Sequence, residues 1–514
     1  MRDSSVIVQT PNPNDHKAIS PWLDEQIWGH RIWDSQSPWL LFLEFMTVAE
    51  ACQREERLFD EQGLFYPLNF KPYKRMYLRN ILFNNEVIFQ TDEQIPDSAT
   101  AWATWLEWMS NKAQAVPNRD FAYLKPRFET FHDFALLIGM LRSSAVESDS
   151  NKRWTSRFVF PFGPNALYED LAISPSGTPT REYINFGRTG ELLYLMLCRS
   201  EHKEALKPHM EALLKGDNPW NTLLGLLQPG PDDDRTSRGH SYLPYKCHPL
   251  FTDLSEDWLN VFTLQLPGFD SLLHIVTLSA FYVLLYQLWV ATEWATGERK
   301  PFMICEVVAP KKTLVRELSF TNYLANNSLP EKAIAAYIDE IEQSSEWQEA
   351  LGESESFMKC RYILITRVRW GEDYFGSNSP EALLTELRAD ALKRHRQHVA
   401  NVHRNYGRGI GLVSRRGTTK LRYAPTDGFL KTLLLANVDV RMELSEFLDQ
   451  LFQRYGLIFG EREAEQVLAK EEFDKKVFQA NAHRLEQRLS SLGMLRRLSD
   501  SCAYVENPYS RRSA

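Results

Sequence analysis

Apolar residues recur at helical spacing along most of the chain, and this pattern predicts a mainly α-helical, multi-domain protein with short β strands. A helix begins at Ser37-Pro38, which is a typical helix start. More helices are predicted at about 99–114 and 127–144, two or three short ones within 188–228, and one from near Ser379-Pro380 past 400. Strand-like runs are shorter, at 157–164 (RFVFPFGP) and 303–309 (MICEVVA).

The length of 514 residues predicts several domains. Pro, Gly, Asp and Ser crowd the run QPGPDDDRTSRGHS at 228–241, which is therefore the clearest internal loop or linker. We expect a flexible N-terminal arm at 1–20, a helical N-terminal domain at 21–230, a helical middle domain at 242–390, a basic helix end and hairpin at 391–425, and a separate C-terminal domain at 426–514.

The C-terminal region has the most specific pattern. Thr426 and Asp427 can cap a helix that ends near Val438, and an amphipathic helix at 443–455 is stopped by Gly456. A short helix at 461–469 and a long one at 473–492 follow, and Gly493 ends the latter. The runs MLRRLSD and CAYVENP then form two short strands joined at 499–501.

This order of helices and a terminal hairpin resembles the winged helix-turn-helix family, in which the last long helix enters the major groove of DNA and the hairpin contacts the backbone. The resemblance places Lys476, His483, Gln487 and Arg488 of the long helix in the groove, and Arg496 and Arg497 on the wing. Lys475 and Arg484 of the same helix are further candidate nucleic-acid contacts. The insertion between the helices is acidic and longer than usual, and many winged helices bind protein. Protein interaction, dimerisation and a different fold therefore remain open.

Residues 393–422 form a basic segment with nine Lys or Arg, three His and no Asp or Glu, although the whole chain carries a net charge of −8. Clustered like charges repel one another, and a polyanion such as a phosphate backbone would neutralise them. We expect a helix end that Gly407, Gly409 and Gly411 break, followed by a hairpin around 417–419. The candidate phosphate contacts are Lys393, Arg394, Arg396, Arg404, Arg408, Arg415, Arg416, Lys420 and Arg422. A solvated or acid-paired basic surface is the alternative.

Signatures of catalysis are absent from the sequence: it contains no GxxxxGK[ST], HExxH or GxSxG run. Glu306 followed by Lys311 and Lys312 is too widely spaced for a metal-dependent nuclease strand. The acids 232–234 are expected to be a solvated loop. His395, His398 and His403 are expected on a solvated helix face rather than around a metal. The GxGxG run lacks the context of a dinucleotide-binding turn. We expect no cofactor and no metal.

Six dispersed cysteines and an N-terminus without an apolar stretch predict a reduced, cytoplasmic protein. The apolar run 272–291 is long enough to span a membrane. It contains His274, Tyr286 and Gln287, so a buried core helix is favoured and no membrane association is expected.

The runs YGRGIGLVSRRGTTKLRYAPTD at 406–427 and RRLSDSCAYVENPY at 496–509 are similar to accessory subunits of prokaryotic anti-phage defence and restriction systems. This resemblance implies DNA sensing or complex assembly beside a separate helicase, ATPase or nuclease. The hypothesis is a non-catalytic scaffolding subunit that binds nucleic acid, double-stranded DNA in particular, with catalysis supplied by partner proteins. The alternatives are a protein-interaction scaffold whose winged helix dimerises or docks partners, and an unrecognised metal-dependent nuclease.

Overall fold

Two units make up the chain in a computed structural model: an N-terminal unit of Trp39–Cys198 and Lys203–Ser241, and a C-terminal unit of Met1–Pro38, Arg199–His202 and Tyr242–Ala514. The structure describes residues 23–29, 32, 37–60, 69–70, 73–82, 87–113, 116, 119–143, 163–166, 171–173, 179–181, 189–229, 237–238, 243–267, 270–297, 300–308, 313–397, 399–415, 420–469, 473–499 and 502–510.

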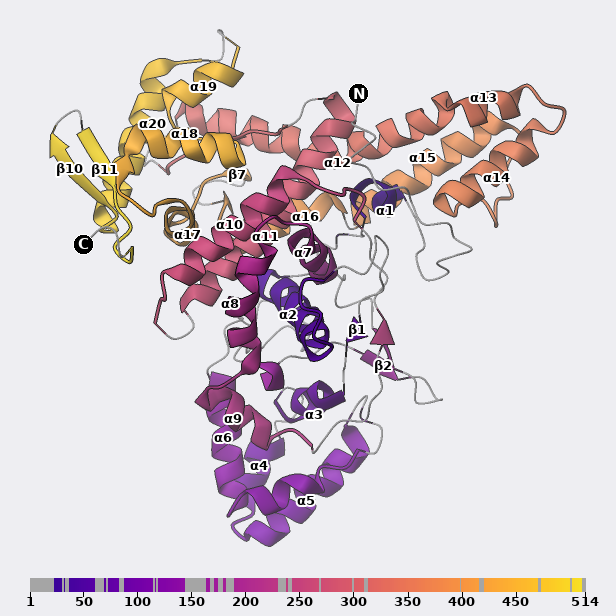
Figure 1. Cartoon of the computed structure of the whole chain (residues 1–514). Coiled ribbons are helices and arrows are strands. Elements are labelled where there is room, and N and C mark those ends of the chain that lie inside the picture. The colour runs from indigo at the N-terminus through magenta and orange to yellow at the C-terminus, as the bar shows by residue number, and fades with distance from the viewer. Residues whose placement is uncertain are drawn as a thin grey trace. The chain divides into compact units, whose positions relative to one another are not determined.

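The N-terminal unit is mainly helical (Figure 1). Its helices are α2 (Pro38–Arg54), α3 (Tyr73–Leu82), α4 (Val87–Gln94), α5 (Ser98–Lys112), α6 (Phe131–Ser143), α7 (Thr189–Cys198), α8 (Lys203–Lys215) and α9 (Pro219–Leu226), with 3-10 turns η1 (Ala122–Arg127) and η3 (Pro164–Ala166). Asp97 caps α5 by accepting a hydrogen bond from the backbone N–H of Thr100. The helices predicted at Ser37 and at 99–114 are thus confirmed, and α6 begins four residues later than expected.

Aromatic rings fill the core between α5 and α6. Trp102 and Trp105 are almost fully buried and meet edge to face, and Phe131 and Phe134 pack against both. Short antiparallel pairs, β1 (Asn69–Phe70) with β4 (Ser237–Arg238) and β2 (Leu171–Ile173) with β3 (Pro179–Arg181), accompany the helices. Most of the strand predicted at 157–164 lies outside the described residues, and Pro164 begins the 3-10 turn η3.

The C-terminal unit is built around the long helix α11 (Asp270–Thr296), the one described helix long and apolar enough to cross a membrane. Its most apolar 18-residue stretch is 89% buried, so α11 is the core helix that its polar residues predicted. It packs against α10 (Pro249–Thr263) and α12 (Leu314–Gln343). Tyr282 of α11 donates a 2.7 Å hydrogen bond to buried Asp257 of α10.

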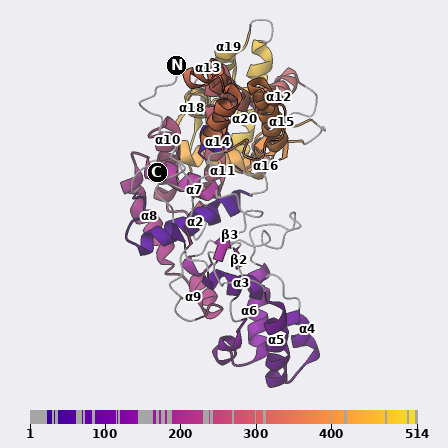
Figure 2. The same ribbon diagram turned by 90° about the vertical axis from the view of Figure 1, so that its right-hand side faces the viewer.

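Helices of the middle region extend from α12. They are α13 (Ser345–Leu351), α14 (Ser356–Val368), α15 (Pro380–Gln397) and α16 (Val399–Gly409), while the short helix α1 (Leu23–Trp28) packs on α11 and α12. Figure 2 shows α12, α15 and α16 side by side. The sequence predicted a single helix from 380 past 400, whereas the structure has two helices in this stretch, α15 and α16.

The C-terminal segment contains α17 (Asp427–Asn437), β8 (Met442–Glu443), α18 (Leu444–Tyr455), β9 (Leu457–Ile458), α19 (Glu461–Val467), α20 (Lys475–Ser491), β10 (Leu495–Ser499) and β11 (Cys502–Val505). Thr426 caps α17 as predicted. Gly456 ends α18 with a φ of 73°, and a side chain there would collide with the carbonyl oxygen of Pro301. β10, β11 and β8 form one antiparallel sheet in that order.

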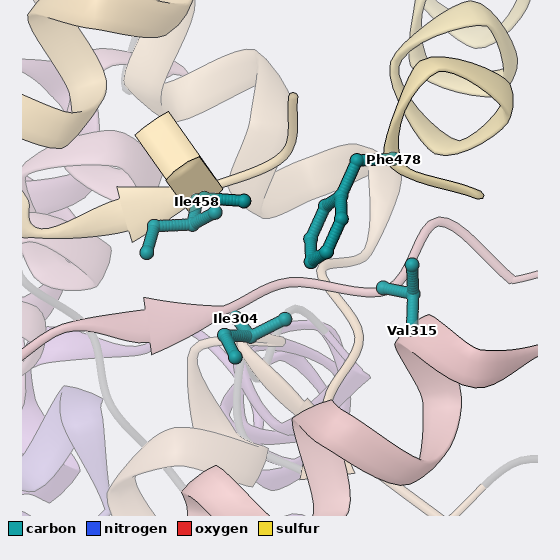
Figure 3. Close-up of a cluster of buried hydrophobic side chains, with 5 residues drawn as sticks. Ile304, Val315, Ile458 and Phe478 are labelled. Carbon is teal, nitrogen blue, oxygen red and sulfur yellow. The ribbon is translucent and has the colours of Figure 1, made fainter. Parts of the chain in front are cut away.

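This segment shares a core with the middle region, so both belong to one unit. β9 pairs in parallel with β5 (Met303–Ile304), a strand shorter than the one predicted at 303–309. Around this pair, Ile304, Val315, Ile458 and Phe478 gather from β5, α12, β9 and α20 (Figure 3). Asn481 of α20, fully buried, donates to the carbonyl oxygens of Cys305 and Phe459 and accepts from the backbone N–H of Val307.

Candidate nucleic-acid interface

The basic segment folds as predicted into a helix end and a hairpin, but the glycines act differently. β6 (Val413–Ser414) and β7 (Arg422–Tyr423) pair antiparallel. Gly407 lies inside α16, where a side chain would collide with Val413, so it permits close packing of helix and hairpin and does not break the helix. Gly411, with a φ of 80°, makes the turn after the helix.

The charges of three arginines of this segment act on the hydroxyl of one tyrosine, Tyr323. Arg404 and Arg408 are four residues apart on α16 and thus on one face, and Arg415 follows β6. Tyr323 of α12 is almost fully buried, and this burial raises the pKa of its hydroxyl to about 12. The charges of all three arginines oppose this effect and lower the pKa. Arg408 and Arg415 are exposed and Arg404 is half-buried. Among the described residues, none of the three forms an ion pair with a carboxylate. We call Arg404, Arg408 and Arg415 the arginine cluster.

Arg422 is a correction to the predicted phosphate contacts, because it points into the core. Its side chain is fully buried and pairs with the carboxylate of Glu306, which is also fully buried. The second oxygen of Glu306 accepts a 2.8 Å bond from Nε of Arg316. Alternate residues of a strand face opposite ways, so a basic hairpin could not present every cation to solvent. Glu306, the acid weighed for a nuclease, is thereby held between two arginines; Lys311 and Lys312 lie outside the described residues.

The remaining cations of the hairpin differ in their surroundings. Lys420 is half-exposed and forms a 3.2 Å ion pair with Glu317, with its ammonium 4.4 Å from the ring centre of Phe320. An exposed pair of this kind is weak and leaves the cation available to a stronger anion. Arg416 lies outside the described residues.

On α15, Lys393 and Arg396 are exposed and Arg394 is half-buried. His395 and His403 are both buried, which corrects the expectation of a solvated face, and burial lowers the pKa of each. Tyr423 accepts from Nδ2 of Asn326 and donates to Nε2 of His403. His398 lies outside the described residues. Within the ranges that the structure covers, no group of three or more His, Cys, Asp or Glu could hold a metal ion.

The residues of α20 predicted to contact nucleic acid form two sets: one is exposed, and the other contacts the rest of the protein. Lys475, Lys476, His483 and Gln487 are exposed, and His483 contacts both Glu486 and Gln487. Arg484 and Arg488 instead contact the protein. Arg484 donates to the carbonyl oxygen of Val307 at 3.3 Å, while Arg488 pairs with Asp427 and donates to the carbonyl oxygen of Pro425 at 3.1 Å.

Both predicted wing arginines are exposed on β10. Arg496 lies opposite Tyr504 of β11. Arg497 is 3.5 Å from Glu486 of α20 and donates to the carbonyl oxygen of Ser499. The β10–β11 hairpin therefore carries two exposed arginines, and Glu486 of α20 partly neutralises the charge of Arg497.

Sequence reasoning missed Tyr323, the residue whose pKa these arginines influence. It lies on α12, about seventy positions before the basic segment, and a single Tyr in a helix gives no sign of that proximity. The sequence draws attention to Glu306 only as a candidate acid of a metal-dependent nuclease. Its arginine partners, Arg316 and Arg422, are evident only in the three-dimensional structure.

No protein-family model matches the chain, and no curated protein matches it. The class of the protein thus depends on its own geometry.

Proposed function

We propose that the chain is a non-catalytic, nucleic-acid-binding and scaffolding protein whose segment 426–510 is a winged helix and whose preferred ligand is double-stranded DNA. The arginine cluster carries this proposal. Three guanidinium groups, two on α16 and one after β6, are near enough for their charges to act on Tyr323, and none has a carboxylate partner among the described residues. Such an arrangement is costly unless an anion neutralises it, and phosphate accepts two parallel hydrogen bonds from a guanidinium.

The order of elements supports the winged-helix part. α17, β8, α18 and α20 precede the β10–β11 hairpin, and β8 joins that hairpin in a three-stranded sheet. The hairpin lies next to the end of the last long helix, as a wing does. The insertion of β9 and α19 between α18 and α20 departs from the usual arrangement.

On α20, an exposed stripe runs along Lys476, Ala480, His483 and Gln487. The opposite face, with Phe478, Asn481, Leu485 and Leu489, is buried. An amphipathic helix with a polar outer stripe can enter a major groove, where Gln and His donate to and accept from base edges. The cytoplasmic location, the role in anti-phage defence and the helicase, ATPase or nuclease partners are proposed from the sequence resemblance alone.

The test is binding of a fluorescent duplex by the full chain, followed by anisotropy at low and moderate salt. We expect the triple variant Arg404→Glu/Arg408→Glu/Arg415→Glu to weaken binding by at least about tenfold. The control Lys332→Glu reverses one exposed charge on α12. Absence of duplex binding at low salt, or equal binding by the triple variant, would refute the proposal.

A protein-docking role is a second candidate, favoured by one observation. A pocket of about 240 Å³ beside α20 is lined by Glu443, Glu461, Glu463 and Glu486, with Arg462 as the basic member. Acids at this flank repel phosphate and suit a basic protein segment. The double variant Glu461→Lys/Glu486→Lys tests this role. Stronger duplex binding by this variant would mean that the acidic residues beside α20 lie close to bound DNA. If the variant abolishes recovery of a specific partner without changing duplex affinity, the docking role is supported.

A further inference from the structure

A pocket of about 600 Å³ lies in the C-terminal unit where the glycine turn after α16 meets α11 and α17. Gly409, Ile410 and Gly411 form one wall, and the first turns of α11 and α17 form others. Ligand pockets generally have volumes of about 300–1,000 Å³, so this one can hold a small organic molecule.

His274 supplies a hydrogen-bond acceptor to this pocket. Its side chain is 5% exposed, and its Nδ1 is 2.7 Å from Oγ1 of Thr432. The single hydroxyl hydrogen of Thr432 goes to the carbonyl oxygen of Gly428, so Nδ1 of His274 must carry the hydrogen in their bond. Nε2 is then an unprotonated acceptor, and it has no hydrogen-bond partner among the described residues. Burial, followed by the charge of Lys431, lowers the pKa of His274 to about 4, which keeps the ring neutral.

Two cations line the same pocket, Arg408 and Lys431. Neither forms an ion pair within the described part of the chain, and the ammonium of Lys431 lies 5.5 Å from the ring centre of Tyr509, another lining residue. Among the described residues that line the pocket, Asp270 is the one acid. The excess of positive charge favours a ligand with an anionic group.

The apolar and aromatic part of the lining includes Leu266, Pro267, Leu273 and Phe429, and the threonines Thr277, Thr426 and Thr432 also line the pocket. A suitable ligand therefore combines an anion, an N–H or O–H donor and a flat organic body. We propose that this pocket binds a nucleoside monophosphate, with its phosphate at Arg408 and Lys431 and a base or sugar hydrogen donated to Nε2 of His274. This site does not depend on the proposed DNA-binding function, although Arg408 serves both.

Gly428 offers a way to close the pocket without damaging the fold. A Cβ at this position would meet no atom within 4 Å, and Gly428 lies in the first turn of α17. Leu is a better helix former than Gly, so Gly428→Leu is expected to preserve or raise stability while its side chain fills the pocket. Ala103→Leu, on the exposed face of α5, is the matched control.

The experiment is isothermal titration of the full chain with AMP, GMP, CMP and UMP, and separately with adenosine and inorganic phosphate. We expect at least one nucleotide to bind about tenfold more tightly than adenosine or phosphate. Gly428→Leu, Lys431→Met and His274→Phe should each weaken that binding, while thermal unfolding confirms that the variants fold and Ala103→Leu binds normally.

Absence of binding by all four nucleotides would overturn the proposal, as would unchanged affinity in Gly428→Leu. Phosphate bound as tightly as the nucleotides would also overturn it. Duplex binding by Gly428→Leu and Lys431→Met separates this site from the DNA-binding function, because neither residue belongs to the arginine cluster.

Discussion

Arginines drawn from the same basic segment have two opposite kinds of surroundings. Arg404, Arg408 and Arg415, whose charges act on Tyr323, have no described acid partner, whereas Arg422 is fully buried with Glu306 and Arg316. The first group is a surface charge that an external anion can neutralise. The second is an internal ion pair that fixes β7 against the strand and helix around it. Local charge density in a sequence therefore identifies a basic region but not which of its cations reach solvent.

The largest effect is expected from breaking the buried group. Glu306→Ala leaves two arginines in the core without their carboxylate, and we expect a loss of about 3–5 kcal/mol in the free energy of unfolding, measured by urea denaturation. Glu317→Ala, which removes an exposed acid partner, should cost less than about 1 kcal/mol.

A second variant tests the role of the buried ion pair if Glu306→Ala does not fold. Replacement of the three residues together, as Glu306→Leu/Arg316→Met/Arg422→Met, removes the carboxylate along with its two arginines, so it should be less destabilising than Glu306→Ala. If the single variant is as stable as the natural chain, Glu306 does not hold this core together.

An intermediate effect is expected from pH. Burial lowers the pKa of His403 to about 3, whereas an unfolded histidine titrates near 6.5. Between these values the unfolded chain binds more protons, so the free energy of unfolding should fall as the pH drops below about 6.5. We expect a loss of about 1 kcal/mol per pH unit from this residue, measured by urea denaturation at pH 7 and pH 5.

His403→Gln serves as the control, because its amide can still accept the hydrogen of Tyr423. The variant should show a shallower pH dependence than the natural chain, while the buried residues His248 and His274, with their pKa lowered to about 4, maintain part of it. The same pH dependence of the free energy of unfolding in both proteins would contradict the claim that burial keeps His403 neutral in the folded state.

The smallest effect is expected at the boundary between the groups, where Lys420 is paired with Glu317. Glu317→Gln removes this ion pair and one negative charge, and we expect about twofold tighter duplex binding at low salt that disappears at high salt. Anisotropy titrations at two salt concentrations measure it. Weaker binding would mean that Glu317 positions Lys420 for its contact.

Periodicity and capping predicted much of the fold. The buried character of α11, the Thr426 cap, the stop at Gly456 and the hairpin β6–β7 all follow from local patterns. Long-range packing could not be predicted in this way. The parallel pairing of β5 with β9 joins positions about 150 residues apart, and it involves two residues on each strand, too few for a distinct pattern.

The candidate site was predictable only as a region. The exposed positions Lys476 and Gln487 follow from amphipathic spacing, because the buried face of α20 is marked by Phe478, Leu485 and others. The burial of Arg422 depends on Glu306, more than a hundred positions away, and no local rule connects the two.

The central claim is that the arginine cluster contacts a phosphate backbone. The most direct measurement is the slope of the logarithm of duplex affinity against the logarithm of salt concentration, for the natural chain and for Arg404→Glu/Arg408→Glu/Arg415→Glu. Each lost phosphate contact reduces the slope by about 0.9, so the triple variant should lose about 2.7. Equal slopes in the two proteins would contradict the account.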